Sequence, residues 1–338
     1  MVSESPGPLD GDALDAMAGG LLRTQLLHVA ARLGVADRAA AGPFSAGELA
    51  AETGADPDAL FRVLRALASL GVLTQDADDR FGPTFASERL RPGSPGSSHA
   101  LVLSYGEAWW WSAVGGLHES VMTGETAFDR LHGEPLFDWL AAHPEASEAF
   151  DANMTAMTAV EAQAVVAVAE LPQTGTVVDV AGGRGTLLAA VLRSRPGLRG
   201  VLFDQPHVVG KAGSLLDDVA DRCEVVAGSF FEAIPPDAEL YTLKDILHDW
   251  NDADAARILR TVRSAIPATG RLLVVERVVP PGDAPASAKL VDVTMLVLTG
   301  GRERTADQYA RLLAEAGFRL DAVTPTTAGT DVIAASPV

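Results

Sequence analysis

The sequence predicts an α/β protein whose C-terminal half contains a doubly wound, mainly parallel sheet, with an all-helical domain before it. Beyond residue 175, short runs rich in β-branched residues alternate with helical stretches, as in TVVDV, LLAAVLRS and RGVLFD. Such alternation is typical of βαβ units, whose strands pair in parallel. Before residue 170 the apolar residues recur at helical spacing instead, and 338 residues are enough for two domains.

The first helical segment follows a polar N-terminus, residues 1–11, which we expect to be disordered. Residues 13–41 then have the apolar spacing of an amphipathic helix. One side of this predicted helix gathers its apolar residues: Leu21, Leu22, Leu26, Leu27, Val29, Leu33 and Val35.

Residues 45–75 predict a helix–turn–helix. Ser45 precedes Glu48 at capping-box spacing, Gly54 ends the first short helix, and Asp56-Pro57 begins the second. The second helix has an apolar face made of Leu60, Val63, Leu64, Leu67 and Leu70. The segment VLTQDADDRFGPT that follows resembles a small β-wing, so the domain is predicted to be of winged-helix type.

The middle of the chain, residues 101–170, reads as mostly helical and is rich in aromatic residues. We therefore divide the chain into a winged-helix domain at 12–100, a helical connector at 101–165 and the α/β domain at 166–338.

Charge and composition exclude several classes of function. The formal net charge of −19 disfavours a nucleic-acid partner and an anionic membrane surface. The single cysteine, Cys223, excludes an intramolecular disulfide and a cysteine-rich metal site, and we predict no metal. The N-terminus lacks a basic region followed by an apolar run, and no apolar run is long enough for a membrane span, so we expect a cytoplasmic protein.

The first α/β strand leads into a glycine-rich turn, residues 181–185, and a helix starts near Thr186. The turn is not G-x-G-x-x-G, because Leu188 occupies the third glycine position, and no Gly-Lys-Ser/Thr follows as in a P-loop. Asp179 directly precedes the turn, and its carboxylate would oppose a pyrophosphate but favour a cationic ligand.

S-adenosylmethionine fits this pattern, since it carries an ammonium, a sulfonium, a ribose and an adenine but no phosphate. The second strand ends at Asp204, whose carboxylate is suited to the ribose hydroxyls. After the third strand, Ser229 and Phe230 offer a hydroxyl and an aromatic ring for the adenine. The alternative is a doubly wound domain that binds another nucleotide or none.

The fourth and fifth strands end near His248 and Glu276, so these residues are expected at the same sheet edge as Asp179 and Asp204. Methyl transfer to a phenol, whose pKa is about 10, needs a base, and histidine is suited to that role. A carboxylate on the far ring nitrogen would fix the tautomer, and Glu276 and Glu303 are the candidates. Lys244 either pairs with the cofactor or is solvated.

Six segments in order resemble the dimeric class I small-molecule O-methyltransferases, Rossmann-like enzymes that include plant caffeic acid and flavonoid enzymes and actinobacterial enzymes of aromatic polyketide biosynthesis. The resemblance covers residues 15 to 335. It rests on DVAGGRG (179–185), LFDQPHV (202–208), GSFF (228–231), LKDILHDWND (243–252), LLVVE (272–276) and DVTMLVLTGGRERT (292–305).

This resemblance implies a homodimer held by the N-terminal domain, and methyl transfer from S-adenosylmethionine, leaving S-adenosylhomocysteine, to a hydroxyl of an aromatic small molecule in natural-product biosynthesis. His248 is then the general base, and Glu276 and Glu303 flank its ring. The cofactor residues implied are Asp179, Ala181, Gly182, Gly183, Asp204, Ser229, Phe230 and Lys244; those for the acceptor are Trp110, Phe150, Met154 and Met295. The family usually has glycine at Ala181 and aspartate at Ser229.

Two alternatives stay open on the sequence alone. A winged helix–turn–helix also occurs in transcriptional regulators, but residues 45–82 are acidic and the second helix, 57–70, carries only two arginines, so packing is favoured over DNA binding. The same fold and cofactor also serve decarboxylation or hydroxylation of aromatic polyketides, and the retained His248 argues against this.

Overall fold

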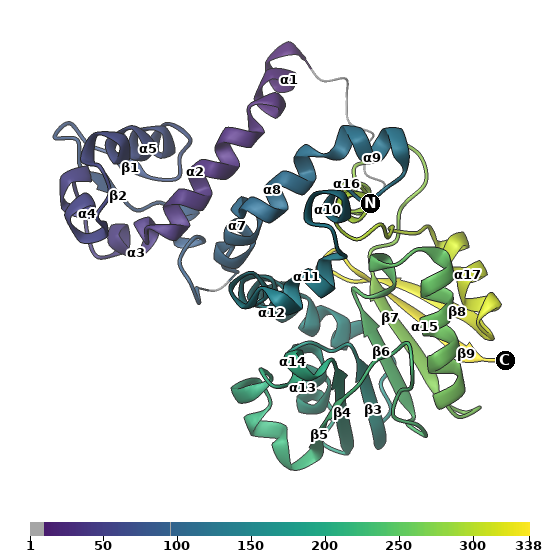
Figure 1. The fold of residues 1–338 in the computed structure, drawn as a ribbon. Helices are drawn as coiled ribbons and strands as arrows, with labels where there is room; N and C mark the ends of the chain where they lie inside the picture. Colours follow the sequence, from purple (N-terminus) through teal and green to yellow (C-terminus); the bar gives the residue numbers. More distant parts are fainter. Residues whose placement is uncertain (1–9, 95) are drawn as a thin grey trace. The chain divides into compact units, whose positions relative to one another are not determined.

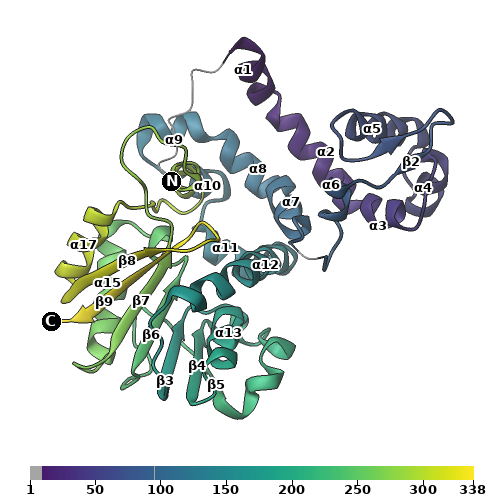
Figure 2. The same ribbon diagram turned by 180° about the vertical axis from the view of Figure 1, so that it is seen from behind.

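The computed structural model describes residues 10–94 and 96–338, which form two compact units, residues 10–111 and 112–338. The two units are coloured along the chain in Figure 1 and seen from behind in Figure 2. Most of the segment predicted to be disordered, residues 1–9, lies outside the described residues, whereas Asp10 already caps the first helix.

The N-terminal unit is helical except for one short hairpin. Its elements are α1 (Gly11–Ala18), α2 (Gly20–Arg32), α3 (Val35–Ala40), α4 (Ala46–Thr53), α5 (Pro57–Ser69), β1 (Thr74–Gln75), β2 (Phe81–Gly82), α6 (Phe85–Glu88), α7 (His99–Gly106) and the start of α8 (Ala108–Gly115). The antiparallel pair of β1 and β2 lies in the segment predicted to be a wing.

Local chemistry sets the helix ends in this unit. Ser45 and Glu48 make the predicted capping box at the start of α4, Gly54 ends α4 in a left-handed conformation, and Asp56 caps α5. Leu60, Leu64 and Leu67 of α5 are buried in the core of the unit. Burial of each such leucine stabilises the fold by about 1.5–3 kcal/mol.

Two details of the N-terminal prediction were wrong. The predicted helix 13–41 is three helices, broken at Gly19 and at Gly34, whose φ of 64° favours glycine. Leu70, which was predicted on the buried face of the second helix, is 44% exposed because α5 ends at Ser69. On α2, Leu21 and Leu22 are 62% and 61% exposed.

The C-terminal unit begins with helices and continues into the sheet. Its helices are α9 (Leu117–Thr123), α10 (Ala127–His132), α11 (Leu136–Ala142), α12 (Pro144–Val168), α13 (Thr186–Ser194), α14 (Pro206–Val209), α15 (Asp252–Ala265), α16 (Ser287–Leu298) and α17 (Ala306–Glu315). Three short 3-10 turns cover Gly213–Leu215, Asp217–Arg222 and Leu247–Asp249.

The sheet has seven strands in the order β5-β4-β3-β6-β7-β9-β8. The five strands from β5 to β7 pair in parallel, and β9 is antiparallel to both β7 and β8. The strands are β3 (Gly175–Val180), β4 (Leu198–Asp204), β5 (Cys223–Ala227), β6 (Leu240–Lys244), β7 (Arg271–Glu276), β8 (Phe318–Pro325) and β9 (Asp331–Pro337). The predicted α/β class with a doubly wound, mainly parallel sheet is confirmed.

Helices cover both faces of this sheet (Figure 1). Val177 of β3 packs in a core with residues of α12 and α13, whereas Val178 and Val180 pack in a second core with α15 and α17. This alternation follows from the two-residue period of a strand. Because β3, β4, β6 and β7 are parallel and in register, their carboxyl ends bring the loops after Val180, Asp204, Lys244 and Glu276 to one edge.

Candidate active site

The glycine-rich turn after β3 is shaped for a close approach of a ligand to the backbone. Ala181, Gly183 and Gly185 have φ values of 55°, 60° and 84°, all left-handed. A side chain at Gly182 would collide with Asp179 Oδ2 and Leu202. Ala181, where the resembled family usually has glycine, tolerates this conformation because its side chain is a single methyl group.

Two carboxylates lie beneath this turn. Asp179 is 1% exposed and accepts a hydrogen bond of 2.6 Å from Thr242 Oγ1, whereas its Oδ2 atom is buried and has no hydrogen-bond partner among the described residues. Burial raises the pKa of Asp179 to about 6, against the lowering effect of Thr242. Asp204 Oδ2 accepts from Gly183 N at 2.8 Å, and burial raises the pKa of Asp204 as well.

S-adenosylmethionine fits these residues. The Oδ2 atom of Asp179 is buried without a hydrogen-bond partner, and the ammonium and sulfonium of the cofactor are groups that such an oxygen can bind. A bound cation would also offset the cost of burying the Asp179 carboxylate beside Asp204. Glycine at 182 lets the turn lie directly against Asp179 and Leu202, and Gly183, with its left-handed φ, carries no Cβ beside its own N–H. The described residues hold no group of three or more His, Cys, Asp or Glu side chains arranged for a metal ion.

Ser229 and Phe230 lie in the loop after β5, and Lys244 is the last residue of β6, at the same end of the strands. The Ser229 hydroxyl accepts from Phe231 N at 3.3 Å, and the Phe230 ring contacts Phe231 and Trp250, with ring centres 4.8 and 6.0 Å away. The Lys244 ammonium is neither solvated nor free, since it is 6% exposed and pairs with Glu161 at 2.7 Å and with Asp245.

Lys244 belongs to a closed ring of four charges. Arg277 completes it by pairing with Glu161 at 2.8 Å and with Asp245 at 3.2 Å. Burial by itself raises the pKa of Asp245, but the cations around it outweigh burial and lower the pKa to about 2. Because Glu161 lies on α12, this ring ties that helix to the sheet edge.

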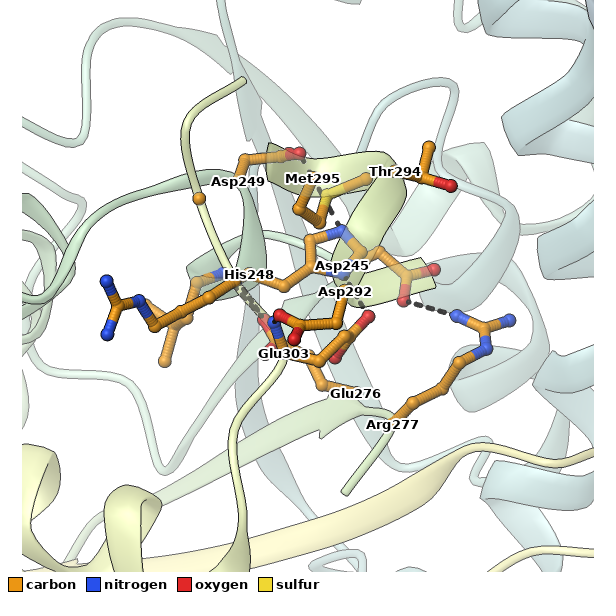
Figure 3. A network of polar contacts seen from close by, with 12 residues as sticks. Asp245, His248, Asp249, Glu276, Arg277, Asp292, Thr294, Met295 and Glu303 are labelled. Carbon is orange, nitrogen blue, oxygen red and sulfur yellow. Dashed lines mark hydrogen bonds and ion pairs between the residues drawn. The ribbon is translucent and has the colours of Figure 1, made fainter. Parts of the chain in front are cut away.

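His248 lies in the 3-10 turn Leu247–Asp249 that follows β6. Its Nδ1 atom is 2.8 Å from Glu303 Oε1, and its Nε2 atom is 3.8 Å from Asp249 Oδ1 (Figure 3). The Glu303 side chain is completely buried, and its backbone N–H donates to Asp292 of α16. The Glu303 carboxylate therefore holds the imidazole with Nδ1 as the protonated nitrogen and leaves Nε2 for other chemistry.

The carboxylates around His248 dominate its charge state. Burial alone lowers the pKa of His248, but Asp249, Glu303 and Glu276 outweigh burial and raise the pKa to about 10. Burial raises the pKa of Asp249 to about 7 and raises that of Glu303 too. A cofactor cation in this site would counteract the stabilisation of the imidazolium by these carboxylates.

Glu276 takes a different position from the one predicted. It does not hydrogen-bond the His248 ring; its Oε1 atom accepts from the backbone N–H groups of Ile246, Leu247 and His248 at 3.1, 2.5 and 3.2 Å. Its other oxygen, Oε2, accepts from the Tyr309 hydroxyl. Glu276 is 0% exposed and anchors the backbone of the loop that carries His248.

A family model described as the O-methyltransferase domain matches residues 114–319, and one described as the O-methyltransferase dimerisation domain matches residues 16–90. The chain belongs to the O-methyltransferase family. Membership confirms the assignment of the sequence to S-adenosylmethionine-dependent O-methyltransferases. Because the helix–turn–helix falls within the dimerisation match, a packing role is favoured for it over the regulator alternative.

Three related O-methyltransferases show how far the similarity extends. The chain is 44% identical to phenazine O-methyltransferase PhzM of Lysobacter antibioticus, over 95% of each chain. It is 39% identical to mitomycin biosynthesis 6-O-methyltransferase of Streptomyces lavendulae, over 96% of this chain and 95% of that one. Among solved structures, the chain matches the O-methyltransferase NcsB1 from neocarzinostatin biosynthesis, in complex with S-adenosylmethionine and 2-hydroxy-5-methyl naphthoic acid. The TM-score is 0.83 and the sequence identity 31%, and the match covers 94% of this chain and 96% of that one.

Within this O-methyltransferase, aromatic side chains connect one predicted acceptor residue, Phe150, to Trp250, which follows the His248 turn. Phe150 of α12 lies edge-on to Phe137, whose ring is in turn stacked 6.2 Å from Trp250. Met154 is on the same helix as Phe150, and Met295 is a buried residue of α16 drawn with the His248 network in Figure 3. Trp110 lies in the N-terminal unit, where it stacks on Tyr105 at 4.7 Å.

Sequence reasoning missed several residues of this network: Glu161, Asp245, Asp249, Arg277, Asp292, Arg304 and Tyr309. Asp245 and Asp249 had a signal, because they flank His248 in the same motif. Glu161 and Tyr309 had no such signal in the sequence. Each lies on a helix that the spacing of its apolar residues already predicts, and that spacing does not indicate that a carboxylate or a hydroxyl on the helix has a buried partner.

Proposed function

We propose that this chain transfers a methyl group to a hydroxyl of an aromatic small molecule in natural-product biosynthesis, with His248 as the general base. The observation that carries the proposal is the pair of His248 and Glu303, 2.8 Å apart and buried beside the ligand edge of the sheet. Glu303 occupies Nδ1, which leaves Nε2 to receive the proton of the acceptor hydroxyl.

When bound, S-adenosylmethionine supplies an electrophilic methyl group on its sulfonium sulfur. We propose that Asp179, the turn at Ala181–Gly183, and Asp204 hold it, with Ser229 and Phe230 on its adenine side. Lys244 contributes by holding Asp245 and Glu161 in place, since its ammonium is already paired. The His248 ring takes up the hydroxyl proton as that oxygen becomes methylated, and the resulting imidazolium is stabilised by Glu303.

An aromatic acceptor is supported by the rings near His248 and by the names of the relatives. Phe137, Phe150 and Trp250 offer flat apolar surfaces, and Met154 and Met295 add polarisable side chains suited to a planar molecule. The names of the two relatives above refer to phenazine O-methylation and to mitomycin biosynthesis.

The direct test incubates the protein with methyl-labelled S-adenosylmethionine and a panel of hydroxylated aromatics: hydroxyphenazines, hydroxyquinones, naphthoic acids and phenolic acids. We expect label in an O-methyl product of at least one panel member, identified by mass spectrometry and NMR. Decarboxylated or hydroxylated products without transferred label would instead support the other chemistry of this fold, and a panel without any labelled product would contradict the proposal.

The rate of methyl transfer should rise with pH, because the base form of His248 must lose a proton. In the cofactor-free chain the pKa of His248 is about 10. The sulfonium charge of bound S-adenosylmethionine disfavours the imidazolium, so the pKa should be lower with S-adenosylmethionine than with the product S-adenosylhomocysteine, whose sulfur is neutral. NMR titration of the ¹⁵N-labelled histidine ring with each ligand measures this difference. A rate that is flat from about pH 6 to 9 would argue against a titrating base.

We propose that the chain is a homodimer that associates through α1 and α2. The match to a dimerisation domain supports association, and these helices expose Leu14, Met17, Leu21 and Leu22, each more than half exposed. An exposed apolar row of this kind is typical of an interface.

We also propose that the chain is divided into a winged-helix domain at residues 12–100, a helical connector at 101–165 and a catalytic domain at 166–338.

Light scattering should therefore give the mass of two chains of 35.2 kDa, and Leu22→Asp should reduce it to that of one chain. Because the Leu22 side chain is exposed, the substitution should leave the thermal stability of the single chain almost unchanged. Arg23→Asp, at an exposed position of the same helix, is the control and should remain dimeric. A wild-type monomer at micromolar concentration would refute the dimer.

A further inference from the structure

Four consecutive residues, 301–304, lie against the loop that carries His248. A side chain at Gly301 would place its Cβ atom 2.0 Å from the His248 carbonyl oxygen, so the two segments approach at backbone distance. The next residue, Arg302, donates its N–H to the same oxygen at 2.8 Å. Glu303 then contacts the ring of His248 at Nδ1. The fourth residue, Arg304, has no role in the function proposed above.

Arg304 is the largest side chain that is fully buried in the described part of the chain, at 1% exposure. Its Nη1 atom donates to the Leu247 carbonyl at 2.7 Å, and its Nη2 atom donates to the Trp250 carbonyl at 2.8 Å. The Asp252 carboxylate neutralises the guanidinium from 2.9 Å. The two carbonyls flank His248, one residue before it and two residues after it.

We propose that Arg304 is a positioning residue for the transfer reaction: its guanidinium fixes the carbonyls on both sides of His248 and so sets the orientation of the imidazole. The inference rests on the proposed role of His248 as the base. Glu276 binds the N–H groups of the loop and Arg304 binds its carbonyls, so the backbone of the loop is held by opposite charges.

The shape of the guanidinium explains why arginine is needed. Its planar fork carries separate N–H donors that reach two carbonyls and a carboxylate in fixed directions, whereas a lysine ammonium is a single compact point charge. Lysine at this position would keep the charge opposite Asp252 but could not reach both carbonyls with the same geometry. A shift of about 1 Å in a base is enough to reduce the rate by about 100-fold.

The test compares Arg304→Lys with Arg222→Lys. Arg222 is a matched control, because its guanidinium also donates to two carbonyls, those of Leu198 and Leu192, at the opposite end of the strands. Arg304→Lys should lower kcat by about 10- to 100-fold while the Kd for S-adenosylmethionine changes less than about 2-fold. Arg222→Lys should leave kcat unchanged even where its thermal stability falls by a similar amount.

Two further measurements separate a positioning role from a structural one. In a His248→Ala background, Arg304→Lys should have no additional effect on kcat, because both changes remove the same interaction. NMR of the labelled ring should show the pKa of His248 moving toward its ordinary value in Arg304→Lys, as the contact with Glu303 loosens. The ring measurement needs no turnover, so it tests Arg304 even if His248→Ala shows that the base is elsewhere.

Unchanged kcat and an unchanged ring pKa in Arg304→Lys would overturn the proposal, and so would additive losses of rate in the double variant. If Arg304→Lys does not fold, Asp252→Asn provides the second variant, since it leaves the guanidinium in place but removes its counter-charge. We expect Asp252→Asn to reduce kcat by a smaller factor than Arg304→Lys. A larger loss in Asp252→Asn would contradict the role assigned to the carbonyl contacts.

Discussion

Replacing His248 with alanine should lower kcat by about 100-fold or more, while the affinity for S-adenosylmethionine changes little. The imidazole is the buried group whose free nitrogen can accept the hydroxyl proton, and alanine leaves the buried Glu303 carboxylate without its partner. Initial rates at saturating acceptor and isothermal titration with S-adenosylmethionine in the absence of acceptor measure the two effects.

Two variants serve as controls for this result. His118→Ala removes an exposed histidine of α9 in the same unit and should behave as wild type. Glu303→Gln keeps the shape of the ring's partner but removes its charge, so its kcat should fall between those of wild type and His248→Ala. Full activity of His248→Ala would mean that proximity alone drives the transfer and would remove His248 from the mechanism.

Replacing Glu276 with alanine should reduce the free energy of unfolding by at least about 4 kcal/mol, because each buried donor that loses its acceptor costs about 1–3 kcal/mol and four donors are affected. Three backbone N–H groups and the Tyr309 hydroxyl would lose their acceptor together. Activity should also fall steeply, since the His248 loop loses its anchor. Urea denaturation followed by circular dichroism measures the loss of stability.

Glu276→Gln separates the two roles considered for Glu276. Glutamine keeps an oxygen for the loop N–H groups but carries no charge, so a backbone anchor predicts a small loss of stability and activity. A carboxylate that acts on the imidazolium through its charge would instead make Glu276→Gln as inactive as Glu276→Ala. That second outcome would restore the role first predicted for Glu276, beside the ring.

The fold was predictable because its signals are local. β-branched runs such as TVVDV, the glycine turn, and the caps at Ser45 and Asp56 each specify an element from a few neighbouring residues. The parallel pairing then brings strand ends together wherever they lie in the sequence. Where the local signal was weak, the prediction was wrong: nothing in the apolar spacing of residues 13–41 indicated that Gly19 and Gly34 would break the helix.

The candidate site was predictable only in part. Topology places His248 and Glu276 at the same edge, but it does not specify which atoms of a loop a carboxylate binds. Glu276 faces backbone N–H groups because the turn after Asp245 directs them at the end of β7, a detail of φ and ψ that no spacing reveals. Glu303 reaches His248 over 55 residues, and the sequence offered it only as one of two candidate carboxylates, without showing which of them binds the ring.

The ring of Lys244, Glu161, Arg277 and Asp245 also constrains how this sequence can diverge. Each charge touches two of the opposite sign, and the four sum to zero in a buried place. Loss of any one leaves an uncompensated buried ion, which costs about 3–5 kcal/mol. A substitution that removes one of these four charges is therefore strongly destabilising by itself. Related sequences should either keep all four charges or replace a cation and its anion together.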